Sequence, residues 1–432
     1  MPLSTFDGLG LVEPLRLALK AENHLKPTPI QARTIPLLVT GNDLLGIAET
    51  GSGKTAAFAL PILQRLSLER HPPTPGAPSA LILAPTRELA SQIGERIGAY
   101  GKGLPLRSTV IFGGVNQHHQ VKALKAGVDI LIATPGRLLD LCAQRHVRLD
   151  KVSILVLDEA DRMLDMGFIH DVRKIVGLCR HERQTLLFSA TMPPPIAKLA
   201  RDILHDPVRV DIAPAKIAVD RIKQRVLFVG TKEKQALLEA LLADRDMDRV
   251  LIFTRTKRGA DRVCRNLVRA GFTAVALHGN KAQNARTRAL DAFRTGKVRI
   301  LVATDIAARG IDVPNISHVV NYELPLEPES YIHRIGRTAR AGAGGAALSF
   351  CDQNERSQLA AIERLMRSPV PVGEHRLAMA ARPTDRQSPR SGPTTPGKQR
   401  KRFRGRRFSS VQPAAPSPAK IERAYHSRGD LA

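Results

Sequence analysis

A glycine-rich segment between an apolar run and a helical pattern has the composition of a phosphate-binding loop. Residues 44–48 are mostly apolar, the segment Gly51-Ser52-Gly53-Lys54-Thr55 follows, and a run of small apolar residues comes next. Glycines let backbone N–H groups turn toward a phosphate, and the start of a helix adds further donors and its dipole. We expect Lys54 to reach the β- and γ-phosphates of a nucleotide and the Thr55 hydroxyl to bind Mg²⁺. The alternative is a turn that only caps a helix.

Two adjacent acids complete the chemistry that such a loop needs. Asp158 and Glu159 come directly after the apolar run Ile154–Leu157. Open α/β sheets bind ligands at the carboxyl ends of their strands, which is where these acids would lie. There Asp158 would hold Mg²⁺ and Glu159 would polarise the water that attacks the γ-phosphate. Acids at a helix start can also compensate the helix dipole, but together with the glycine-rich loop they favour catalysis.

Short apolar runs that alternate with longer amphipathic stretches must position these residues. One series of runs rich in Ile, Leu and Val ends near residue 188, and a second begins near residue 225. This alternation predicts strands and helices of an α/β fold with mostly parallel sheets. We therefore predict two tandem α/β domains at residues 1–212 and 221–368, joined by a linker at 213–220. Residues 369–432, rich in Pro, Ser, Gly and Arg, are predicted to be a disordered basic tail.

The charge balance points to a polyanionic partner. The chain has 66 Lys and Arg against 40 Asp and Glu, a formal net charge of +26 over 432 residues. Clustered positive charge favours nucleic acid, although a basic surface that serves solubility is the alternative. No apolar run reaches the roughly 18 residues of a membrane-spanning helix, so we expect no membrane partner. The chain start lacks a secretory pattern and its four cysteines are widely spaced, which predicts a cytoplasmic protein.

The order of these and further motifs resembles that of the DEAD-box RNA helicases. Asp158-Glu159-Ala160-Asp161 is the motif that gives the family its name, and the resemblance extends from about Phe6 to Phe350. Details at Asp165–Phe168 and Gln184–Phe188 look closest to the bacterial RhlE-like group. The resemblance implies two RecA-like domains, with ATP and Mg²⁺ as cofactors. The other matching segments are Pro27–Gln31, Pro85–Leu89, Gly113-Gly114, Thr134–Arg137, Ser189–Thr191, Ile252–Thr254, Gln283–Arg286, Ala303–Asp312 and His333–Arg340.

By this resemblance, both domains contribute to the nucleotide site. Phe6 would stack on adenine, and the amide of Gln31, which can donate and accept, would read its edge. Arg337 and Arg340 match arginine fingers, which stabilise the charge on the departing γ-phosphoryl group. Asp312 matches a contact to the ribose. The nucleotide-binding positions in full are Phe6, Gln31, Gly51, Ser52, Gly53, Lys54, Thr55, Gly310 and Asp312.

The same resemblance places RNA across both domains. Hydroxyls, glycines and arginines at these positions can grip a sugar–phosphate backbone, which carries no sequence information. Each residue taken alone could instead be a turn or cap residue. Asp161, Ser189 and Thr191 match positions that couple the nucleotide state to unwinding. The implied RNA contacts are Thr86, Arg87, Gly114, Thr134 and Arg137 in the first domain and Thr254, Gln283, Arg286 and Thr304 in the second.

The sequence therefore predicts an ATP-dependent RNA helicase that separates short duplexes and remodels RNA or ribonucleoprotein as ATP draws the domains together. An ATP-timed RNA clamp or annealing chaperone is one alternative, and a DNA-directed translocase is another. Phe403 and Phe408 lie among arginines in the tail, which we expect to tether RNA unless it docks on a protein. Ribosomal or RNA-decay proteins are candidate partners.

Overall fold

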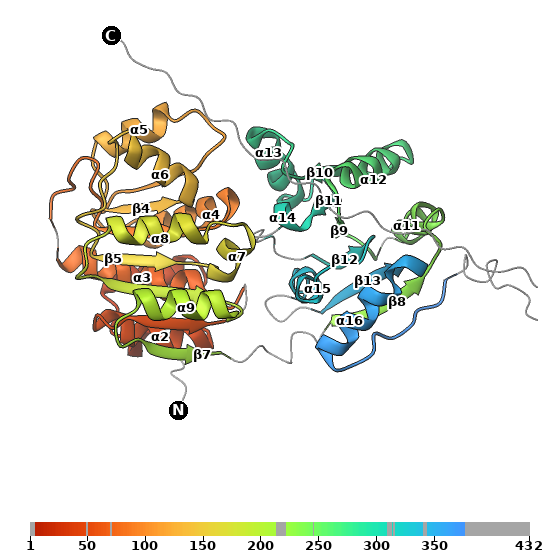
Figure 1. The fold of residues 1–432 in the computed structure, drawn as a ribbon, viewed down its shortest axis with the longest axis horizontal. Helices are drawn as coiled ribbons and strands as arrows, with labels where there is room; N and C mark the ends of the chain where they lie inside the picture. Colours follow the sequence, from red (N-terminus) through yellow and green to blue (C-terminus); the bar gives the residue numbers. More distant parts are fainter. Residues whose placement is uncertain are drawn as a thin grey trace, which may run out of the picture. The chain divides into compact units, whose positions relative to one another are not determined.

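The computed structural model describes residues 5–375 except 49–50, 70, 213–221, 245, 309–312, 314–315 and 340–343. Two α/β lobes follow one another along the described chain: the N-terminal lobe, residues 5–212, and the C-terminal lobe, residues 222–375 (Figure 1). The predicted linker at 213–220 and the chain from residue 376 onward lie outside the described residues. In the part that the structure describes, no helix combines the length and the apolar character needed to cross a bilayer.

A parallel sheet of seven strands, in the order β3-β4-β2-β5-β6-β1-β7, forms the centre of the N-terminal lobe. Its strands are β1 (Leu44–Ile47), β2 (Ala80–Leu83), β3 (Ser108–Ile111), β4 (Ile130–Ala133), β5 (Ile154–Leu157), β6 (Gln184–Ser189) and β7 (Val208–Asp211). Its helices are η1 (Phe6–Leu9), α1 (Glu13–Ala21), α2 (Pro29–Val39), α3 (Lys54–Leu68), α4 (Arg87–Tyr100), α5 (His118–Lys125), α6 (Pro135–Ala143), α7 (Ala160–Asp165), α8 (Ile169–Leu178) and α9 (Pro194–Ile203).

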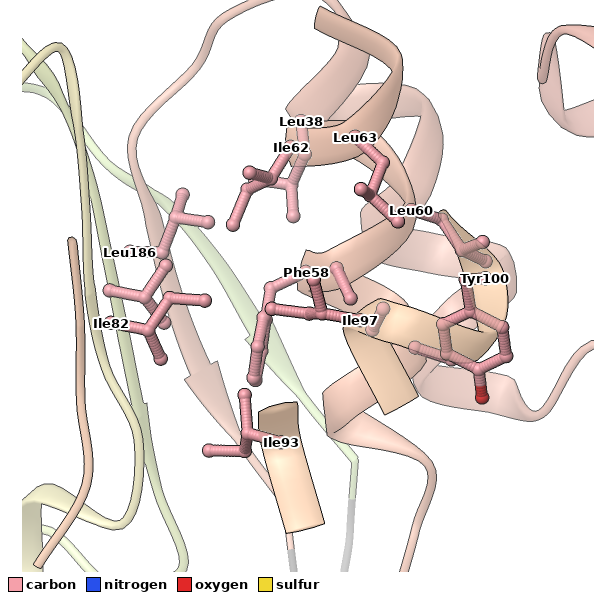
Figure 2. Close-up of a cluster of buried hydrophobic side chains, with 14 of the residues drawn as sticks. Leu38, Phe58, Leu60, Ile62, Leu63, Ile82, Ile93, Ile97, Tyr100 and Leu186 are labelled. Atoms are coloured by element: carbon pink, nitrogen blue, oxygen red, sulfur yellow. The ribbon is translucent and has the colours of Figure 1, made fainter. Parts of the chain in front are cut away.

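Alternate residues of the central strands pack on opposite faces of this sheet, as strand geometry requires. On one face, Ile82 and Leu186 pack with Phe58 of α3 and Ile93 of α4 (Figure 2). On the other face, residues such as Leu187 pack against α6, α8 and α9. Helices therefore cover both faces, which explains why the strand sequences are almost continuously apolar. Only the strand ends are left to carry polar chemistry.

The C-terminal lobe repeats this plan with a six-stranded parallel sheet in the order β10-β11-β9-β12-β13-β8. Its strands are β8 (Ile222–Phe228), β9 (Val250–Thr254), β10 (Ala274–Leu277), β11 (Ile300–Thr304), β12 (His318–Asn321) and β13 (Gly345–Cys351). Its helices are α11 (Lys234–Leu242), α12 (Lys257–Arg269), α13 (Gln283–Arg294), α14 (Asp305–Ala308), α15 (Pro328–Ile335), η3 (Gln353–Glu355) and α16 (Arg356–Met366). The predicted fold class, two parallel-sheet α/β domains, is confirmed.

The packed chain extends past residue 368, where the sequence predicted that the second domain ends. Val370 is 4% exposed and joins the core formed by β8, α15 and α16. Val226 of β8 donates its N–H to the carbonyl of Pro371 and accepts, through its own carbonyl, from Gly373, each at 2.9 Å. Residues 370–373 are thus an edge segment of the lobe rather than tail. Pro369 and Pro371 suggested the start of a tail, but proline is tolerated at a sheet edge.

Candidate active site and nucleic-acid interface

The glycine-rich loop connects β1 to α3 as predicted. Gly51 and Gly53 have φ values of 89° and 95°, a conformation that favours glycine. A side chain on Gly53 would collide with Gln31, whose Nε2 donates to the Gly53 carbonyl at 3.0 Å. The side chain of Lys54 is buried, and its Nζ donates to the Ala48 carbonyl at 2.7 Å. The side-chain amide of Gln31 and the ammonium of Lys54 thus both donate to backbone carbonyls around this loop, at the carboxyl edge of the sheet.

Gln31 is held in place by the start of its own helix. Its Oε1 accepts from the backbone N–H of Thr28 at 2.9 Å, one half of a capping box at the start of α2. Because its Nε2 contacts the loop, this one amide joins α2 to the phosphate-binding segment. Phe6, the other predicted adenine contact, is 6% exposed in η1 and packs in the lobe core. The structure therefore gives Gln31 a structural role beside its predicted reading of adenine.

Asp158 ends β5 with a carboxylate that suits a cation. It is 2% exposed, and its Oδ1 has no hydrogen-bond partner among the described residues. Burial raises the pKa of Asp158 to about 7, against the effect of nearby Lys54, while Glu159 and Asp161 add to the increase. A buried acid without a partner is costly unless a positive charge compensates it. These properties fit Mg²⁺, which uses one or two protein oxygens together with nucleotide phosphates, and Thr55 is the predicted second ligand.

Glu159 follows in a backbone conformation that few residues adopt. Its φ is 55°, in the left-handed region where a non-glycine residue is uncommon and often functional. Its Oε2 accepts from Arg162 Nη1 at 2.9 Å, and both side chains are almost completely buried. No role was predicted for Arg162 from the sequence. The only signal was its position three residues after Glu159, on the same helical face.

The three predicted coupling residues form one hydrogen-bond network. Oδ2 of Asp161 accepts from the N–H groups of Ala190 and Thr191, at 3.1 and 2.9 Å, and from the Thr191 hydroxyl at 3.0 Å. The Asp161 N–H donates in return to Ser189 Oγ at 3.2 Å. The end of β5 is therefore tied to the end of the neighbouring strand β6. Displacement of the segment that carries Asp158 and Asp161 would be transmitted directly to residues 189–191.

The predicted RNA contacts of the N-terminal lobe gather at three adjacent strands. They follow β2, β3 and β4, whereas the nucleotide residues follow β1 and β5, with β6 between those two strands. Thr86 caps α4 by accepting from the Leu89 N–H at 3.2 Å. Gly114 has a φ of 75°, and a side chain there would collide with the Arg87 guanidinium. Arg137 Nη2 reaches the Val115 carbonyl at 3.4 Å, so the three motifs lie side by side.

The C-terminal lobe shows the same division along its own sheet edge. Thr254 and Thr304 end the adjacent strands β9 and β11, and Gln283 and Arg286 lie in the first turns of α13, which follows β10. All four predicted RNA contacts thus end, or follow in sequence, one of the strands β9, β11 and β10, which are the three strands at one end of the sheet. The finger segment, that is, the motif at 333–340 with the predicted finger Arg337, follows β12 in the sequence, and β12 lies on the other side of β9. Strand order separates a candidate RNA face from a candidate nucleotide face in each lobe.

Arg337 lies just after α15, and its position depends on another arginine. Arg337 is 3% exposed, and its Nε donates to the His333 carbonyl at 3.3 Å. Three residues earlier, Arg334 binds both carboxylate oxygens of Asp305 and the carbonyl of Glu323. Arg334 belongs to the His333–Arg340 motif, but no role was predicted for it from the sequence. The predicted contacts Gly310, Asp312 and Arg340 lie outside the described residues.

Comparison with known protein families gives two matches that together cover more than half of the chain. The description DEAD/DEAH box helicase matches residues 28–199, and the description Helicase conserved C-terminal domain matches residues 233–342. These two regions include the phosphate-binding loop, the paired acids and the described part of the finger segment.

Among curated proteins, the ATP-dependent RNA helicase dbp2 of Neurospora crassa is 44% identical over 387 residues, 88% of this chain and 69% of that protein. DBP2 of Chaetomium globosum is 46% identical over 355 residues, 81% of this chain and 63% of that protein. The chain thus spans about two thirds of these relatives. They are fungal, and they do not support the bacterial RhlE-like subgroup expected from the sequence.

Solved structures show the same similarity. Dbp5 of S. cerevisiae, bound to RNA and ADP BeF3, is 34% identical with a TM-score of 0.77, over 85% of this chain and 96% of that chain. A DEAD box protein from Methanococcus jannaschii is 39% identical with a TM-score of 0.52, over 87% of this chain and all of that chain. At these identities the likeness extends beyond the fold to the sequence.

Proposed function

The chain belongs to the DEAD/DEAH box family of ATP-dependent RNA helicases, and we propose that it separates short RNA duplexes by ATP-gated closure of its two lobes. One observation carries this proposal: strand order sets the candidate RNA residues apart from the candidate nucleotide residues in each lobe. Each lobe then has half of an ATP site and half of an RNA site. Two ligands that both prefer the closed arrangement favour closure together.

Within this proposal the N-terminal lobe binds and orients the nucleotide. The loop at Gly51–Thr55 holds its phosphates, and Gln31 recognises adenine. Thr55 and Asp158 hold Mg²⁺, which neutralises charge on the phosphates when bound. Glu159, fixed by Arg162, orients the attacking water. Lys54 and Mg²⁺ supply part of the positive charge that the γ-phosphoryl group needs as it leaves, but the predicted arginine fingers that supply the rest belong to the other lobe.

The C-terminal lobe supplies that charge. Arg337, with Arg340, acts as an arginine finger, a contribution worth several orders of magnitude in rate where it has been measured in other nucleotidases. RNA is gripped through its backbone by Thr86, Arg87 and Arg137 from one lobe and by the β9–β11 residues from the other. Contacts to backbone give little sequence preference. In the closed arrangement the strand is bent, and a regular duplex cannot follow that bend.

The test is the Glu159→Gln variant of the full chain. It should bind ATP and RNA as tightly as the wild type, because the amide keeps the size of the carboxylate, yet it should not turn over ATP. Wild-type hydrolysis by this variant would contradict the role of Glu159.

Duplex separation by the wild type distinguishes a helicase from an ATP-timed clamp, which would retain RNA without separating strands. Stronger ATPase stimulation by DNA than by RNA would favour a DNA translocase.

The cellular setting is part of the proposal. We place the enzyme in the cytoplasm, with ribosomal or RNA-decay proteins as partners, because its widely spaced thiols and basic charge suit that compartment and RNA-rich assemblies. RNAs crosslinked to the Glu159→Gln variant in cells would identify the target. Recovery of ribosomal RNA would favour assembly, and recovery of messenger RNA would favour decay.

A further inference from the structure

Helix α12 of the C-terminal lobe carries a row of arginines that the sites described above do not use. Ala260, Val263 and Leu267 on one side of α12 are buried against β9, β10 and β11. On the opposite side, arginines recur at spacings of four, three and four residues, which keeps them on one helical face over about 16 Å. All of them are exposed. This arginine row consists of Arg258, Arg262, Arg265 and Arg269.

The positive charge of the arginine row is not neutralised within the lobe. None of its members forms an ion pair with any residue that the structure describes. The one acid of α12, Asp261, points to a different face, where it contacts His278 Nε2 at 3.0 Å and Lys281 Nζ at 2.9 Å. Like charges three and four residues apart destabilise a helix. The row therefore costs stability in the free protein, and an anion bound along it would offset that cost.

The start of α12 lies against predicted RNA contacts. Thr254, at the end of β9, donates its hydroxyl to the carbonyl of Thr256, the residue that caps α12, at 3.2 Å. Lys257 Nζ donates to Asn280 Oδ1 at 2.8 Å, in the turn that leads to Gln283. The arginine row therefore begins between the β9 and α13 parts of the candidate RNA face. From there it extends along the surface away from the strand ends.

The chemistry of the row favours RNA phosphates over an acidic protein surface. Guanidinium groups bind phosphate oxygens with two parallel hydrogen bonds. Arginine is also enriched at protein interfaces, but there it accompanies aromatic residues and Met, whereas the described exposed surface of α12 offers only Val268 as a large apolar side chain. Continuity with the candidate RNA face supports the same choice. We propose that the arginine row binds the backbone of RNA that extends beyond the core site, an inference that rests on the proposed RNA function.

The test compares two charge-matched double variants of the full chain. Arg262→Gln/Arg265→Gln removes two charges from the arginine row. Arg364→Gln/Arg367→Gln removes two exposed charges, also three residues apart, beside β8 at the opposite end of the same sheet. Fluorescence anisotropy would measure the affinity for a short oligonucleotide that fills only the core site and for a longer strand, each over a range of salt concentrations with a non-hydrolysable ATP analogue.

The row variant should bind the long strand several-fold more weakly. Its slope of log affinity against log salt should fall by about 1.4, because each lost phosphate contact on a single strand contributes about 0.7. Short-strand affinity and the ATPase rate with saturating short RNA should stay at wild-type values, and circular dichroism should show an unchanged or higher Tm. Wild-type affinity for the long strand would overturn the proposal, and so would an equal loss in the control variant. If the wild type bound neither strand, the proposed RNA function itself would fail.

Discussion

Arg334 and Asp305 form a two-point ion pair inside the C-terminal lobe, in which Nη2 donates to Oδ2 at 2.7 Å and Nε donates to Oδ1. The arginine side chain is 1% exposed and also lies over the Phe253 ring. The pair joins the end of β11, which carries Thr304, to α15, which precedes Arg337. One side chain thus fixes the geometry between the candidate RNA face and the candidate nucleotide face of this lobe.

Asp305→Asn should destabilise the C-terminal lobe by about 3 kcal/mol, because it leaves a buried guanidinium with a neutral partner. The cost lies at the low end for buried pairs, since Asp305 is 25% exposed. Hydrogen exchange of the full chain would measure it as faster exchange in β11 and α15, with the N-terminal lobe unchanged. Asp291→Asn, which loses an exposed pair at 4.0 Å, is the control and should change little. Equal exchange in the two variants would show that the buried pair stabilises nothing.

Asp161→Asn should uncouple ATP hydrolysis from strand separation. The carboxylate accepts three hydrogen bonds from residues 190 and 191, and a hydrogen bond to a charged group contributes about 1.5–3 kcal/mol. Loss of one such bond shifts the equilibrium between coupled and uncoupled arrangements about tenfold or more. Duplex separation should therefore fall much more than RNA-stimulated ATPase activity, measured in one reaction mixture. Asp171→Asn on α8 is the control, and a parallel decline of both activities would argue against a coupling role.

Most central strands were predictable from the sequence because they are short, buried apolar runs, but the strand order was not. Thr86 and Thr134 lie on one side of Asp158 because β4 and β2 stand together on the same side of β5, which no single run encodes. Side-chain partners were equally hidden. Arg162 and Arg334 stand inside recognised motifs, yet their contacts to Glu159 and Asp305 appear only when the helices are placed.

The pKa of Asp158 predicts opposite effects of pH on activity and on stability. Burial raises this pKa to about 7 in the metal-free protein, so below that value a proton competes for the carboxylate with the Mg²⁺ that we propose it binds. ATPase activity should therefore fall as pH decreases below about 7. For folding the sign is reversed: the folded state binds the proton more tightly than the unfolded state, so the contribution to stability is present at low pH and is lost as pH rises through about 7.

The variant Asp158→Asn tests both effects. It mimics the protonated acid, so it should be inactive at every pH yet have a higher Tm than the wild type at pH 8. The difference should shrink as pH falls and should vanish only below the unfolded-state pKa of 3.8, where the wild-type acid is protonated in both the folded and the unfolded state. Differential scanning calorimetry without nucleotide or metal would measure them. A lower Tm for the variant at pH 8 would contradict the buried, unpartnered state of this carboxylate.

Gly114→Ala should weaken RNA binding without affecting the KM for ATP. A methyl group at this position would collide with the Arg87 guanidinium, and the φ of 75° is strained for alanine. We expect the RNA concentration for half-maximal ATPase stimulation to rise several-fold, while the KM for ATP stays constant. Gly98→Ala is the matched control, because Gly98 lies in the last turn of α4 with open space for a Cβ, so alanine there should not destabilise the protein. An unchanged RNA requirement in the first variant would remove Arg87 from the RNA contacts.

Two truncations separate the edge segment at 370–373 from the basic residues that follow. A chain that ends at residue 368 loses Val370 from the core and both backbone hydrogen bonds to Val226, so its Tm should fall; burial of a valine alone contributes about 1.5–3 kcal/mol. A chain that ends at residue 375 keeps these contacts and should keep its Tm.

The 1–375 chain nevertheless lacks 14 Lys and Arg against 3 Asp and Glu. We expect it to bind RNA more weakly and with a smaller salt dependence, while its ATPase rate without RNA stays near that of the full chain. Equal RNA affinity of the 1–375 chain and the full chain would instead assign the basic residues to a protein partner. Equal Tm values for the two truncations would show that residues 370–373 contribute nothing to the fold.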